Sequence, residues 1–147
     1  MMSDDDRAML ILQKAVMRAK DMLERTQNFR PFAMMLYDDG SIKTIENKVN
    51  DVENNYEQLR DSMKIRAKEG GVDVLAIVID TLIPERFAKG VPNGIRLHLE
   101  EKSQKDKKVS ARYIYVPYQL VKTNSSDAIH AELYPPVPTG FPAEFLK

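Results

Sequence analysis

Cysteine is missing from the sequence. Disulfides, thiolate zinc sites, iron–sulfur clusters and cysteine nucleophiles are therefore excluded together, and the chain suits a reducing compartment. An excess of either charge is missing too, because 22 Lys and Arg residues balance 22 Asp and Glu residues. Proteins that bind nucleic acid usually carry a basic excess or a basic stripe, so we expect no nucleic-acid partner.

Long hydrophobic runs are also missing: no stretch of the sequence approaches the roughly 18 apolar residues of a membrane span. The acidic residues Asp4, Asp5 and Asp6 replace the basic region and apolar run of a signal peptide. We therefore expect a cytoplasmic protein with no membrane partner. Glycine-rich phosphate loops, G-x-S-x-G and H-E-x-x-H are absent as well, so the corresponding enzyme classes have no motif support.

What the sequence does contain is organised around residues 72–83. The run from Val74 to Ile79 is unbroken apolar, with two glycines before the segment and Pro84 after it. A short, β-branched run that is punctuated at both ends is typical of a strand buried on both faces. We therefore predict a central strand in which Ile77 and Val78, on opposite faces, are both buried.

Two amphipathic helices are predicted. The first covers residues 3–29, with Ser3 as its cap and acidic residues in its first turn. The second covers residues 51–69, with Asn50 or Asp51 as its cap and a Gly-Gly stop after it. In both segments apolar residues recur at spacings of three and four, which predicts one buried stripe per helix.

Further strands are predicted around this framework. Asp38-Asp39-Gly40 separates two strand-like runs and indicates a hairpin, because Gly accepts the positive φ that such turns need. Residues 95–100 alternate strictly between apolar and polar side chains, and residues 110–116 and 128–134 follow as strands. Pro117 is expected to end its strand or to lie at an edge, and residues 135–142 are too rich in proline for regular structure.

These elements predict one α+β domain over the 147 residues, with a Pro-rich C-terminal tail at 135–147. The expected architecture is a two-layer sandwich: a mostly antiparallel sheet of roughly five to six strands with two long helices packed on one face. The other face would be closed by the tail, by a bend in the sheet or by a second subunit.

The two histidines form the first candidate site. They occur as His98-Leu-Glu100 and His130-Ala-Glu132, and strand alternation places each His and its Glu on the same face. If the two strands were neighbours, two imidazoles and two carboxylates would suit a divalent metal ion. The other interpretation is that all four are polar residues on the outer faces of amphipathic strands. We favour this second interpretation, so no resident cofactor is predicted. A site for a divalent metal ion is kept as the alternative.

Four more residues are candidates for function. Asp80 interrupts the apolar run, so it is either a catalytic carboxylate with a raised pKa or a structural group that pairs with one such as Arg86. Tyr113 and Tyr115, with Tyr118 beyond them, either form a stacking platform or pack under a helix or at a dimer interface.

Several short motifs together resemble a group of small bacterial proteins of uncharacterised function. These motifs are Pro31-Phe-Ala with Asp38-Asp39-Gly40, then Gly94-Ile-Arg-Leu-His-Leu-Glu100, then Val116-Pro-Tyr118, and they span most of residues 30–120. The resemblance implies a bacterial source and brings no activity or ligand with it.

The function favoured by the sequence is a non-catalytic binding module that acts as a homodimer. Its tyrosines, its alternating strand and its Pro-rich tail offer apolar area for contact with a second copy or with another protein. The first alternative is a metal-binding protein or metal-dependent enzyme that uses the two His-x-Glu pairs. The second is an immunity or adaptor protein that binds a protein partner.

Overall fold

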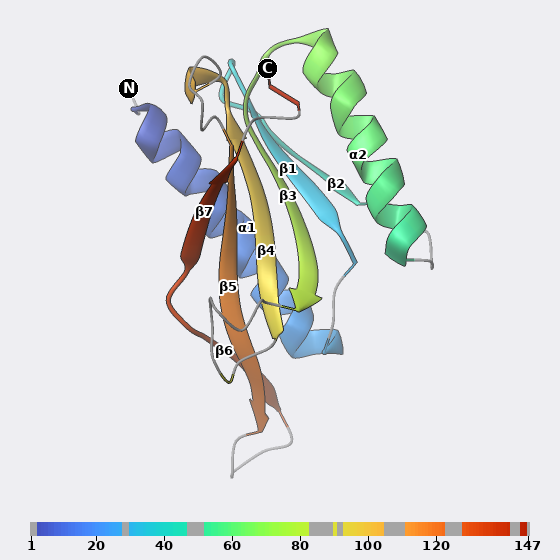
Figure 1. Cartoon of the computed structure of the whole chain (residues 1–147), viewed down its shortest axis with the longest axis vertical. Coiled ribbons are helices and arrows are strands. Elements are labelled where there is room, and N and C mark those ends of the chain that lie inside the picture. Colours follow the sequence, from blue (N-terminus) through green and yellow to red (C-terminus); the bar gives the residue numbers. More distant parts are fainter. Residues whose placement is uncertain are drawn as a thin grey trace.

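The computed structural model describes residues 3–27, 30–46, 52–82, 90, 93–104, 111–122, 128–141 and 145–146. Figure 1 shows how its helices and strands follow one another. In chain order they are α1 (Asp4–Thr26), β1 (Phe32–Tyr37), β2 (Ile42–Glu46), α2 (Val52–Glu69), β3 (Val72–Leu82), β4 (Asn93–Glu101), the 3-10 turn η1 (Lys102–Gln104), β5 (Ala111–Lys122), β6 (Ile129–Leu133) and β7 (Val137–Phe141).

The described strands belong to one sheet in the order β2-β1-β3-β4-β5-β6, with β7 paired to β5 beside β6. Each pair of neighbours is antiparallel. β2 and β3 are both antiparallel to β1, so they run parallel to each other, and α2 connects them across β1. The α+β class and the mostly antiparallel sheet are therefore confirmed.

β3 is the predicted central strand, with β1 on one side and β4 on the other. Ile77 and Val78 point to opposite faces of the sheet, and both are buried. The prediction that this strand is covered on both faces is confirmed.

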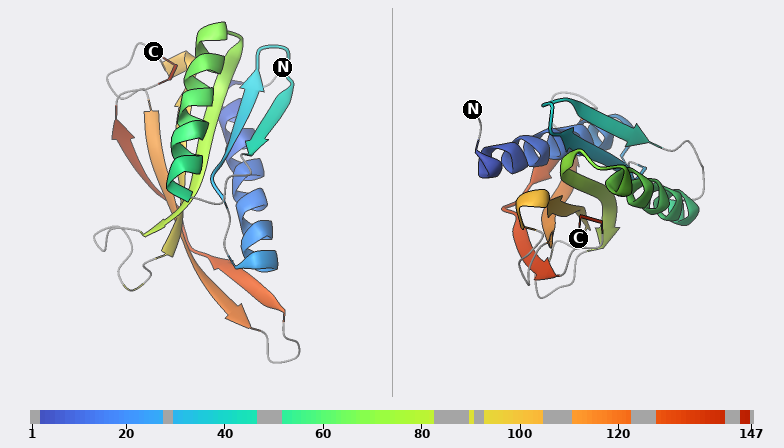
Figure 2. Two further views of the ribbon diagram at one scale, coloured as in Figure 1. Left: turned by 90° about the vertical axis from the view of Figure 1, so that its right-hand side faces the viewer. Right: turned by 90° about the horizontal axis from the view of Figure 1, so that it is seen from above.

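The two helices cover one face each, whereas the sequence placed both on the same face. Val74 and Val78 of β3 pack in one cluster with Ala15 of α1. Ile77 packs in the other cluster with Leu59 of α2. Figure 1 shows α1 passing behind the strands, and Figure 2 shows α2 on the other side of the sheet. The physical reason is that a strand with apolar residues on both faces offers each helical stripe a separate surface.

Local signals set the ends of these elements. Ser3 caps α1, because its Oγ accepts a hydrogen bond from the backbone N–H of Asp6. Gly40 turns the β1–β2 hairpin with a φ of 87°. The predicted cap of α2 at Asn50 or Asp51 lies outside the described residues.

Two predictions that were based on proline residues differ from the structure. Residues 137–141, predicted to be irregular, form β7 and pair with β5 at the edge of the sheet, where proline is tolerated. Pro117 lies inside β5 and does not end it. The outer edge of β5 pairs with β7 up to Tyr115 and with β6 from Tyr118 onward, so Pro117 sits between the two ladders, where the missing N–H breaks no pair.

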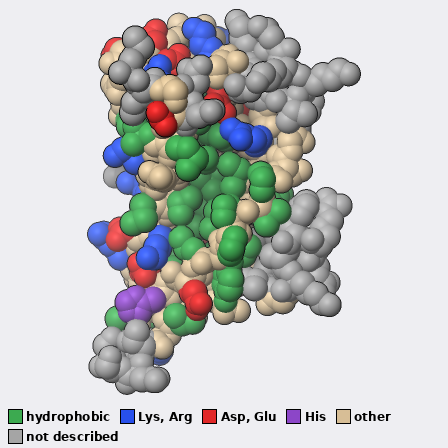
Figure 3. Space-filling model, turned by 90° about the vertical axis from the view of Figure 1, so that its left-hand side faces the viewer, with side chains coloured by type: hydrophobic (Ala, Val, Ile, Leu, Met, Phe, Trp, Pro, Cys, Tyr) green, Lys and Arg blue, Asp and Glu red, His purple; other side chains and the backbone are tan. Residues whose placement is uncertain are grey.

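α1 packs mainly on β1, β3, β4 and β6, so it leaves part of β5 and β7 uncovered on its face of the sheet. Hydrophobic side chains gather on the side of the molecule shown in Figure 3. Among the described residues, neither helix is long and apolar enough to cross a membrane.

Candidate functional site

His98 and Glu100 form a buried pair on the face of β4 opposite α1. Both side chains are 0% exposed, and His98 Nε2 lies 2.5 Å from Glu100 Oε2. The other carboxylate oxygen of Glu100 accepts hydrogen bonds from the backbone N–H groups of Phe145 (2.9 Å) and Leu146 (2.8 Å). Glu100 therefore holds the C-terminal segment against the sheet. The prediction that His98 and Glu100 lie on a solvent-exposed polar face is wrong, because both side chains are buried.

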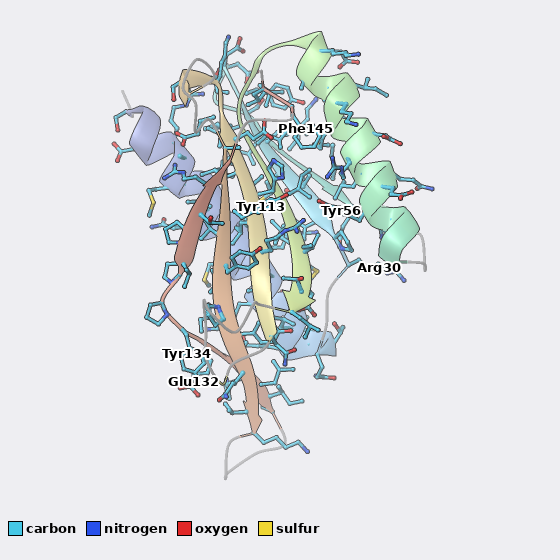
Figure 4. The ribbon with its side chains drawn as sticks, in the orientation of Figure 1. Arg30, Tyr56, Tyr113, Glu132, Tyr134 and Phe145 are labelled. Atoms are coloured by element: carbon cyan, nitrogen blue, oxygen red, sulfur yellow. The ribbon has the colours of Figure 1, made fainter. Side chains whose placement is uncertain are left out.

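His130 and Glu132 lie elsewhere. Both are exposed on β6, and β5 separates that strand from β4. Glu132 lies near the lower end of the molecule in Figure 4, and Phe145, which packs against His98, lies near the upper end. The condition of neighbouring strands is not met, so the two pairs do not converge. In the part of the chain that the structure describes, no group of three or more His, Asp or Glu side chains is arranged to hold a metal ion.

His130 has a local partner. Its Nδ1 lies 3.5 Å from Glu24 Oε2 on α1, and the same oxygen accepts a hydrogen bond from the backbone N–H of Ala131 at 3.1 Å. Glu24 therefore ties α1 to β6, the last strand along the main path of the sheet. An edge strand with a satisfied N–H group is a poorer template for pairing with another chain.

Asp80 lies on the α1 face and is half-buried. It accepts a hydrogen bond from the hydroxyl of Tyr118 at 2.7 Å. Burial raises the pKa of Asp80, and the Tyr118 hydroxyl opposes that rise in part. Burial, with the neighbouring Asp80 carboxylate, also raises the pKa of Tyr118. Asp80 therefore pairs with Tyr118, which agrees with a structural role for this carboxylate. The partner suggested from the sequence, Arg86, lies outside the described residues.

The tyrosines of β5 are divided between the two faces. Tyr113 and Tyr115 share the face opposite α1, with ring centroids 6.4 Å apart, whereas Tyr118 belongs to the core cluster under α1. Arg96 of β4 lies against Tyr113, with its guanidinium carbon 4.5 Å from the ring centroid. The three tyrosines therefore do not form one platform. On the face opposite α1, two of them lie beside an arginine.

The sequence did not predict an apolar groove that the structure forms on the α1 side. It holds about 510 Å³ and runs between α1 and strands β5 to β7; we call it the α1–β7 groove. Among its lining residues are Met9, Met17, Ile114, Leu133, Pro136 and Pro138. Met9 and Met17 are more than half exposed on α1, outside its buried stripe, and they are the sequence signal that was missed.

No family model, no curated protein and no solved structure matches this chain. What the protein does is therefore inferred from its own surfaces.

Proposed function

We propose that the protein is a non-catalytic binding module that acts as a homodimer, and that the two copies meet at their α1–β7 grooves. The observation that carries this proposal is the groove itself, an apolar hollow of about 510 Å³ bordered by exposed methionines. Apolar surface of this kind marks contact sites on soluble proteins.

A second copy of the chain suits the groove for a geometric reason. A two-fold interface needs one patch that fits itself, so each copy must present both a projection and a hollow. Met9 and Met17 project from α1 at the border of the groove. Methionine side chains are flexible and adapt to irregular apolar gaps, so the methionines of one copy are suited to enter the groove of the other.

The charge of the chain also favours self-association. Its formal net charge is zero, so two copies do not repel each other through an excess of one sign. The bacterial source and the cytoplasmic location stay predictions from the sequence. The metal-dependent and the immunity or adaptor alternatives gain no specific support from the described geometry.

The proposal is tested by multi-angle light scattering of the purified chain over a wide range of concentrations. We expect a dimer mass at high concentration that falls toward the mass of the 16.8 kDa chain on dilution. A strict monomer at every concentration would contradict the homodimer.

A further inference from the structure

Arg96 lies on the face of the sheet opposite the α1–β7 groove, between two aromatic rings. Its guanidinium carbon is 4.5 Å from the ring centroid of Tyr113 and 5.7 Å from that of Tyr56 on α2. Its Nη2 donates a hydrogen bond to the Tyr56 hydroxyl at 2.8 Å. Figure 4 shows Tyr56 and Tyr113 on the same side of the sheet, with Phe145 farther up.

Arg96 has no carboxylate partner among the described residues, whereas several other arginines do. Arg7, Arg18 and Arg112 each place Nη2 2.7 Å from a carboxylate oxygen. The Nε of Arg96 is buried and, like the Nε of Arg18, has no hydrogen-bond acceptor within that part of the chain. The aromatic rings stabilise the cation but do not neutralise its charge. A partly buried cation is stabilised further when an anion at the accessible side of its guanidinium supplies the missing negative charge.

Tyr56 adds a second donor to this place. Its hydroxyl oxygen accepts from Arg96 Nη2 and also from Arg60 Nη1, at 3.4 Å. With its oxygen engaged as an acceptor, the hydroxyl has its own hydrogen to donate, and the described residues provide no acceptor for it. The guanidinium of Arg60 lies 5.6 Å from the Tyr56 ring centroid and 5.8 Å from that of Phe145, so it adds positive charge to the same surface.

We propose that Arg96 and the Tyr56 hydroxyl bind the carboxylate of a small molecule that carries a flat, apolar body. A planar guanidinium matches the geometry of a carboxylate, and a tyrosine hydroxyl beside it supplies a further hydrogen bond. The rings of Tyr113 and Tyr115 lie on the same face as Arg96, with centroids 6.4 Å apart, and would border the body of the ligand. This site lies on the other face of the sheet from the proposed dimer contact and does not depend on it.

The test is a titration of the full chain with benzoate, followed by nuclear magnetic resonance of arginine Nε–H and backbone amide groups. Acetate and inorganic phosphate are titrated in parallel at matched ionic strength. We expect benzoate to shift the Arg96 Nε–H signal in a saturable way, and acetate, which lacks the flat body, to bind the same place more weakly. Phosphate that binds more tightly than benzoate would overturn the assignment of a carboxylate ligand.

Three variants locate the effect. Arg96→Gln removes the charge and should weaken benzoate binding by about tenfold or more. Tyr56→Phe keeps the ring and removes only the hydroxyl, and should weaken binding by about threefold or more. Arg25→Gln is the control, because Arg25 is an exposed arginine on α1 whose side chain is 75% accessible and pairs with Asp21; it should bind benzoate as the wild type does.

Several results would overturn the proposal: no saturable shift of the Arg96 signal, or equal binding by Tyr56→Phe and the wild type, or equal weakening in Arg25→Gln. If Arg96→Gln fails to fold, Tyr56→Phe decides the question, because it leaves the packing of the ring in place.

Discussion

At the scale of single residues, Glu100 makes more contacts that stabilise the fold than its position in the sequence suggests. Its carboxylate is fully buried and is bonded to His98 and to two backbone N–H groups of the C-terminal segment. Alternation along β4 predicted correctly that His98 and Glu100 share a face. It did not predict their burial, because the residues that cover them, Phe145 and Leu146, come from the far end of the chain.

Replacing Glu100 with Ala tests this role. The change leaves His98 and two N–H groups buried without their acceptor, so we expect the free energy of unfolding to fall by about 3 kcal/mol or more. Urea denaturation measures the loss. The control is Glu132→Ala on β6, where the side chain is exposed and the expected change is within about 0.5 kcal/mol. Equal costs for the two variants would refute the anchoring role of Glu100.

Asp80 gives a prediction about pH. Burial raises its pKa above the ordinary value of 3.8, so ionisation is less favourable in the folded protein than in the unfolded chain. The contribution of the neutral carboxyl to stability is therefore fully present below the unfolded pKa and is lost as the pH rises through the folded pKa.

We expect Asp80→Asn, which cannot ionise, to gain stability relative to the wild type as the pH rises from about 3.5 to 7. Asp80 is only half-buried, so the gain should stay below about 1 kcal/mol. Urea denaturation of both proteins across this range measures the difference. A difference that is constant with pH, or that favours the wild type increasingly as the pH rises, would contradict the raised pKa.

At the scale of elements, the central strand was predictable because its signal is local. The unbroken apolar run of β3 implies burial on both faces whatever covers them. The placement of α1 and α2 on opposite faces was not predictable from their stripes, since a stripe shows that a helix is buried and does not show against which face. β7 was not predicted because Pro136 and Pro138 indicate irregular chain. A strand forms there only because it lies at the edge of the sheet, where proline is tolerated, and the sequence does not show that position.

Truncating Ile77 and Val78 tests the two-faced strand. Ile77 packs in the cluster of α2 and Val78 in the cluster of α1, so each Ala variant loses burial and leaves a cavity under a different helix. We expect each to lower the free energy of unfolding by roughly 2–4 kcal/mol, measured by chemical denaturation. If one substitution is nearly neutral while the other unfolds the protein, one face of the strand is not part of the core.

At the scale of the whole molecule, the two faces of the sheet present different chemistry. The α1 side carries an apolar groove, and the opposite side carries Arg96 with Tyr56 and Tyr113. Neither surface could be predicted from the sequence, because each combines side chains from segments far apart in the chain. The sequence did contain the parts: exposed methionines on the first helix, prolines near the end, and an arginine at an alternating position of β4.

The measurement that tests the central claim most directly is the mass in solution of two matched variants. Met17 on α1 borders the groove and is 61% exposed, and Ile65 on α2 is 60% exposed on the other side of the sheet. Each is replaced with Glu, which adds the same charge at the same degree of exposure, and each variant is measured by light scattering beside the wild type. A homodimer that forms through the α1–β7 groove predicts that Met17→Glu is monomeric where the wild type and Ile65→Glu are dimeric. A wild type that is monomeric throughout, or a Met17→Glu variant that dimerises as well as Ile65→Glu does, would contradict it.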